Sequence, residues 1–169
     1  MDASSNITDP WLIYGADPTD GIVAIEEDGE GTATLFRRLD GAIILENRQF
    51  KYWLLLSDLA LLEGCRIKHD VTQLASGHFR HLVECNTRQD FWRLRTFTVQ
   101  RYNSLHSKSL TPREYRKVPD LYLIPSTVEQ FMLRSGVTLF KGMEYGDINR
   151  LQIDLEVYTT AGYTFPNAQ

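Results

Sequence analysis

The chain has 169 residues, of which 43% are hydrophobic and 24% are charged, a composition typical of a globular domain. No apolar run approaches the roughly 20 residues that a membrane helix needs. Residues 1–6 lack the basic and apolar regions of a signal peptide, so we expect a cytoplasmic protein with no membrane partner. Cys65 and Cys85 lack the spacing of metal ligands, and we expect both to be free thiols.

The net charge of −4 conceals an uneven distribution along the chain. Residues 1–64 contain 4 Lys or Arg against 12 Asp or Glu, whereas residues 78–117 contain 9 Lys or Arg against 3 Asp or Glu. The basic stretch also contains aromatic residues, namely Phe79, Phe91, Trp92, Phe97, Tyr102 and Tyr115. Basic and aromatic side chains together suit a phosphate backbone and its bases. The alternative is a solvated helix face with aromatic residues in the core.

The first third of the chain predicts β-strands joined by tight turns. Strands are expected at residues 21–25, 32–36, 42–45 and 50–56. The polar residues 26–31 contain two glycines and predict a hairpin, and Asp40-Gly41 predicts the next turn. The first 56 residues are therefore expected to form one unit resembling a β-meander.

A short helix and a further strand are predicted before the basic stretch. Ser57 is placed to cap a helix over residues 58–63, and Gly64 is placed to end it. Residues 79–85 are expected to form the strand.

A longer helix is predicted inside the basic stretch. Thr87 is a suitable N-cap, and the helix is expected over residues 88–102, followed by a polar loop over residues 103–113. Its buried residues are expected to include Phe91, Leu94 and Val99.

The C-terminal part of the chain contains a clear helix signal. Ser126 and Glu129 form the sequence pattern of a capping box, and Gly136 is placed to end the helix. An extended segment is expected at residues 120–124, and strands are expected at residues 137–140 and 151–158.

Asp154 and Glu156 lie in the last of these segments. Residues i and i+2 of a strand point to the same face, so the two carboxylates would converge while Ile153 and Leu155 turn to the core. Mg²⁺ and Mn²⁺ take oxygen ligands of this kind, which makes the pair a candidate metal site. The alternative is a solvated strand face.

The order of these elements resembles the N-terminal part of family-B DNA polymerases. In that family a helix, a glycine and a short strand lead into the first 3′–5′ exonuclease motif, and Ile153-Asp154-Leu155-Glu156-Val157 occupies that place here. Two stretches, at residues 122–125 and 131–136, look like the connection between the N-terminal and exonuclease domains, and residues 78–92 resemble the family's strand and following helix. Val157 replaces the usual threonine of the motif, and Ile153 replaces the common aromatic residue.

The resemblance implies an α+β fold with two parts. A β-rich N-terminal domain of hairpins and a strand–helix unit would occupy residues 1–148, and the first strand of a ribonuclease-H-like exonuclease would occupy residues 149–169. Asp154 and Glu156 would be catalytic residues that bind two Mg²⁺ or Mn²⁺ ions for phosphodiester hydrolysis. The family's other carboxylates would lie beyond Gln169, so this chain alone is expected to be inactive, whereas the parent protein would be a DNA polymerase.

The resemblance also implies partners. These are DNA, as a single-stranded template or a primer–template, and the remainder of the polymerase, either in cis or as a split subunit. The residues expected to contact the DNA backbone are Arg93, Arg95, Arg101, Arg116 and Lys117. Two other functions fit the same residues: a free-standing ribonuclease-H-like nuclease using Asp154 and Glu156, and a non-enzymatic nucleic-acid-binding or interaction module.

Overall fold

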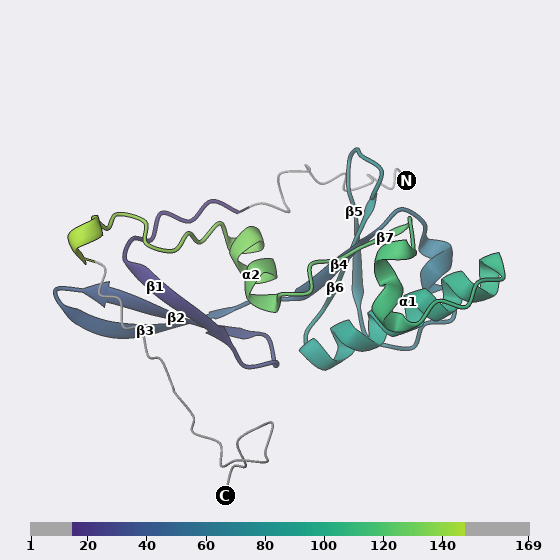
Figure 1. Cartoon of the computed structure of the whole chain (residues 1–169), viewed down its shortest axis with the longest axis horizontal. Coiled ribbons are helices and arrows are strands. Elements are labelled where there is room, and N and C mark those ends of the chain that lie inside the picture. The colour runs from purple at the N-terminus through teal and green to yellow at the C-terminus, as the bar shows by residue number, and fades with distance from the viewer. Residues whose placement is uncertain (1–14, 148–169) are drawn as a thin grey trace, which may run out of the picture.

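The computed structural model describes residues 15–147, which form an α+β fold with two antiparallel sheets and a few helices (Figure 1). The predicted α+β class is therefore confirmed. In Figure 1 the two sheets lie apart, and helix α2 (Thr127–Ser135) lies between them. Asp154 and Glu156 lie outside the described residues, as does the predicted strand over residues 151–158.

The first sheet contains three strands in the order β1-β2-β3. They are β1 (Ile22–Glu27), β2 (Thr32–Leu39) and β3 (Ala42–Gln49). Both predicted hairpins are confirmed. Asp40 and Gly41 form the two-residue turn between β2 and β3, and both have positive φ angles, of 50° and 81°. Two successive positive φ angles define a turn whose twist matches that of the strands, which explains the Asp-Gly sequence here.

The second sheet has the order β5-β6-β4-β7. Its strands are β4 (Tyr52–Leu56), β5 (Asp70–Gln73), β6 (His81–Cys85) and β7 (Leu121–Tyr122). The expectation of a single meander over the first 56 residues is wrong, because β4 pairs with β6 and β7 and not with β3. Every residue of β4 is buried, as expected for a central strand that is covered on both faces. The polar, mostly exposed strand β5 was not predicted.

Helix α1 (Arg88–His106) covers one face of the second sheet. Its predicted N-cap is confirmed, since the Thr87 side chain accepts a hydrogen bond from the Asp90 amide at 3.1 Å. The predicted buried residues Phe91, Leu94 and Val99 lie in the core with alternate residues of β4. The helix is longer than expected, and residues 112–117 form a 3-10 helix, η3 (Pro112–Lys117), against it.

A second 3-10 helix, η2 (Leu59–Leu62), lies where a short helix was predicted. Its cap is Asp58 and not Ser57, because the Asp58 side chain accepts from the Ala60 amide at 2.8 Å. The Ser57 hydroxyl instead donates to Asp120, next to β7.

Helix α2 (Thr127–Ser135) packs against β1 and β4, and so joins the two sheets (Figure 1). The Ser126 side chain accepts from the Glu129 amide, and Gly136 ends the helix with φ +76°, both as predicted. A Cβ atom at residue 136 would lie 2.2 Å from the carbonyl oxygen of Gly15, so only glycine fits. Gln130 is fully buried and accepts from the Trp53 amide at 2.8 Å, which ties α2 to β4.

The strand predicted at residues 137–140 is wrong. These residues form a connection that leads to a third 3-10 helix, η4 (Tyr145–Asp147), and Phe140 has a φ of +60°, which strands do not contain. The connection still borders β1, because the Phe140 amide donates to the Ile22 carbonyl at 2.8 Å and the Gly21 amide donates to the Lys141 carbonyl at 2.9 Å.

Candidate nucleic-acid interface

The five predicted DNA-contacting residues lie on two elements that pack together. Arg93, Arg95 and Arg101 lie on α1, and Arg116 and Lys117 lie at the end of η3. The structure therefore brings together two parts of the basic stretch, but it gives the five cations very different surroundings.

Three of the five cations have carboxylate partners within the chain. Arg93 pairs with Asp90 at 3.4 Å, and Lys117 pairs with Glu114 at 2.6 Å, in both cases three residues apart. Arg101 pairs with Glu63.

The partners explain why these charges are less suited to binding DNA. Hydrogen bonds from Lys117 and from the Thr111 amide and hydroxyl lower the pKa of Glu114 to about 2, so this carboxylate stays ionised beside the lysine. Arg101 also donates through Nε to the Ala60 carbonyl at 3.3 Å and thereby joins α1 to η2. A phosphate would have to compete with these internal contacts.

Arg95 has no carboxylate partner among residues 15–147. Its guanidinium lies over the Trp92 ring, with Cζ 4.6 Å from the ring centroid. Its Nε atom is buried and makes no hydrogen bond in this part of the chain. Burial lowers the pKa of Arg95, and the nearby Arg113 charge lowers it further against a partial opposing effect of Tyr115. A partly buried cation that has no carboxylate partner is stabilised by an added anion.

Arg116 also lies beside an aromatic ring but, unlike Arg95, it is exposed. It lies over the Tyr115 ring, with Cζ 5.8 Å from the ring centroid, and has no ion pair within the described residues. Arg113, also without an ion pair there, was not among the predicted residues. Arg113 could have been predicted from the sequence, because it lies close to two other basic residues, at 116 and 117.

We call the set Trp92, Arg95, Arg113, Tyr115 and Arg116 the α1–η3 surface.

An open groove adjoins this surface on the outer side of α1. It has a volume of about 540 Å³ and lies between α1 and the loop that contains Ile67. Its other lining residues are Gln89, Trp92, Arg93, Arg95, Thr96, Phe97 and Gln100. We call it the α1 groove.

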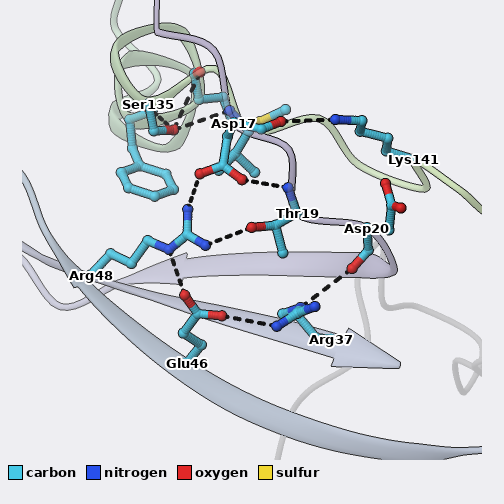
Figure 2. A network of polar contacts seen from close by, with 11 residues as sticks. Asp17, Thr19, Asp20, Arg37, Glu46, Arg48, Ser135 and Lys141 are labelled. Atoms are coloured by element: carbon cyan, nitrogen blue, oxygen red, sulfur yellow. Dashed lines mark hydrogen bonds and ion pairs between the residues drawn. The ribbon is translucent and has the colours of Figure 1, made fainter. Parts of the chain in front are cut away.

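A second cluster of charges, on the first sheet, has a different character (Figure 2). Arg48 donates to Asp17, to Glu46 at 2.7 Å and to Thr19 at 3.0 Å, and Arg37 also pairs with Glu46, at 3.3 Å. Each charge in this cluster has an internal partner, so it stabilises the fold and offers no anion site. Within the described residues, the α1–η3 surface is therefore the better candidate for binding phosphate.

The two predicted metal ligands, Asp154 and Glu156, lie outside the described residues. Within residues 15–147, no group of three or more His, Cys, Asp or Glu side chains is arranged to hold a metal ion. Both cysteines are free, as predicted, and burial raises the pKa of Cys85 to about 12. The binding of Mg²⁺ or Mn²⁺ stays a prediction.

Comparison of the chain with protein-family models, with curated proteins and with solved structures gives no match. None of the helices within residues 15–147 combines the length and apolar character that crossing a membrane requires.

Proposed function

We propose that this chain is the N-terminal, template-contacting region of a family-B DNA polymerase with a proofreading 3′–5′ exonuclease, and that it binds DNA through the α1–η3 surface. The observation that carries the binding proposal is Arg95, a cation that has no counter-ion among the described residues, beside Trp92 and Arg113.

The physical basis is the exchange of counter-ions. Each phosphate that Arg95, Arg113 or Arg116 neutralises releases a condensed cation from the DNA, so affinity falls as salt rises. Arg93, Arg101 and Lys117 contribute less, because each already has a carboxylate partner within 3.4 Å. The charges of the first sheet around Arg48 pair with one another, and β1 of this sheet packs against α2.

The binding proposal is tested with a fluorescently labelled primer–template that carries a single-stranded overhang. Anisotropy titrations over a range of salt concentrations should show weak binding that falls steeply with salt. Arg95→Gln should weaken binding and reduce the slope of log K against log salt by about 1. Arg80→Gln is the matched control, since Arg80 is an exposed cation outside the surface, whose Nε contacts only the Gly77 carbonyl. Binding that does not change with salt would contradict the proposal.

The exonuclease part of the proposal rests on Asp154 and Glu156. In a complete site these carboxylates would help to hold divalent ions that activate a water and stabilise the leaving 3′-oxygen. A titration with Mn²⁺ or Mg²⁺, followed by NMR, should broaden or shift the signals of residues 154 and 156, and Asp154→Ala should remove the effect. Metal-dependent nuclease activity of the isolated chain would instead favour the free-standing nuclease.

A further inference from the structure

The lining of the α1 groove follows from the period of the helix. Gln89, Arg93, Thr96 and Gln100 are spaced by three or four residues and therefore lie on one side of α1. The opposite side of the same helix buries Phe91 and Leu94 in the core. The groove is thus a solvent-facing feature of a helix whose stability comes from its other side. Its volume of about 540 Å³ falls within the range of about 300–1,000 Å³ usual for small-ligand sites.

Three kinds of group meet in the groove. Trp92, Phe97 and Ile67 supply aromatic and apolar walls. Gln89 and Gln100 are exposed, and their side-chain amides make no hydrogen bond within the described residues. Arg95 belongs both to the groove and to the cationic α1–η3 surface.

This combination matches one class of ligand. A nucleobase has a flat face for aromatic walls, polar edges for amide groups and a phosphate one sugar away for an arginine. An acidic peptide would use the cations but not the aromatic walls. A lipid headgroup would use neither the flat walls nor the amides.

We infer that the α1 groove takes one unpaired nucleobase of the strand that the α1–η3 surface binds, so that the ligand at this site is single-stranded nucleic acid. The inference rests on the proposed function and adds a site, on α1, for one base of the bound strand. A base within a duplex has both faces stacked and its edge paired, and cannot enter the groove. The phosphate of the inserted nucleotide lies at Arg95, and the strand continues toward Arg113.

The test compares three labelled ligands at one low salt concentration. They are a 20-nucleotide oligothymidine, an abasic strand with the same number of phosphates, and a 20-base-pair duplex. We expect the abasic strand and the duplex to bind about 10-fold more weakly than oligothymidine, the size expected for one base stacked on aromatic side chains.

Two variants locate the effect in the groove. Phe97→Ala should bring the affinity for oligothymidine down to that for the abasic strand. Gln100→Glu adds a negative charge to an exposed groove position without touching the core, and should weaken binding of oligothymidine even if Phe97→Ala is poorly folded. Tyr145→Ala is the matched control, because Tyr145 is an aromatic residue that is 93% exposed and outside the groove.

The outcomes separate the inference from the proposal on which it rests. Equal binding of the abasic strand and oligothymidine, with Arg95→Gln weakening both, overturns the inference and leaves DNA binding intact. Absence of binding to all three ligands at low salt overturns both. Competition by anionic phosphatidylglycerol vesicles as strong as that by oligothymidine, at equal phosphate concentration, also overturns the inference.

Discussion

The second sheet buries every residue of its central strand β4, whereas the first sheet leaves most of its edge strand β3 exposed. Alternate residues of β4 enter two separate apolar clusters, one with Phe91 of α1 and one with Leu82 of β6. In β3, the apolar residues Ile43 and Leu45 remain 49% and 64% exposed. The first sheet has the smaller core, and its polar side chains are joined in the ion network around Arg48 (Figure 2).

The difference between the sheets explains where a binding surface can form. The charged side chains around Arg48 on the first sheet form ion pairs with one another, and these pairs stabilise the sheet. The second sheet is stabilised by apolar packing against the inner side of α1. The outer side of α1 does not take part in this packing. Cations such as Arg95 can therefore remain without a carboxylate partner, at a cost that the core of the second sheet offsets.

The largest expected effect comes from the apolar core of the second sheet. Phe91 is fully buried against β4, and Phe91→Ala should lower the free energy of unfolding by about 3–5 kcal/mol because it leaves a cavity. The matched change in the first sheet is Leu45→Ala, which removes a mostly exposed side chain and should change stability by less than about 0.5 kcal/mol. Urea unfolding followed by far-UV circular dichroism measures both. Similar losses for the two variants would contradict the contrast between the sheets.

The local parts of the fold were predictable from sequence for physical reasons. Thr87, Ser126 and Gly136 each satisfy backbone groups within their own helix ends, so their effect does not depend on the rest of the chain. The Asp40-Gly41 turn is similarly determined by its own backbone conformation.

The non-local parts were not predictable in this way. An apolar run such as residues 42–45 has the composition of a buried strand, but exposure depends on whether another layer covers it. The assignment of β4 to a different sheet depends on pairing with β6, which lies about thirty residues later. Phe140 has a positive φ, which is not expected for an aromatic residue and could not be predicted from its sequence.

The candidate interface shows the same division. Composition was sufficient to select the five cations of the basic stretch as expected DNA contacts. The pairing of Arg101 with Glu63 joins residues that are distant in sequence, so only the structure could reveal this ion pair. The pairs at Arg93 and Lys117 have i,i+3 spacing and could have been found from the sequence.

A smaller effect is expected where the two sheets meet, at Glu27. This carboxylate is only 4% exposed and accepts hydrogen bonds from Tyr52, Thr127 and the Gly29 amide, while Arg88 pairs with it at 2.7 Å. Glu27→Gln preserves the shape but weakens these charge-assisted bonds, and should cost about 1–3 kcal/mol. Equal stability of the variant and the wild type at pH 7 would show that the contact between the two sheets does not depend on the negative charge of Glu27.

The pH dependence of the same variant gives a second check. Burial alone would raise the pKa of Glu27, but its hydrogen bonds and the Arg88 charge outweigh burial and lower it. A depressed folded-state pKa contributes stability that is present above the unfolded value of about 4.3 and is lost as pH falls through the folded value. The stability difference between wild type and Glu27→Gln should therefore shrink below about pH 4. A difference that stayed constant from pH 7 to pH 3 would exclude a role for the ionised carboxylate.

The smallest effect is expected from the ion network of the first sheet. Arg48→Met keeps the apolar part of the side chain but removes the guanidinium that pairs with Asp17 and Glu46, both partly buried, and should cost about 1–2 kcal/mol. Lys51→Met is the matched control, because the pair of Lys51 with Asp70 is largely exposed and should contribute nothing measurable. Thermal unfolding at low and high salt measures both variants, and the cost at Arg48 should decrease as salt screens the pairs. If Lys51→Met destabilised the chain as much as Arg48→Met, the network in Figure 2 would have no special role, and the first sheet would depend on apolar packing as the second sheet does.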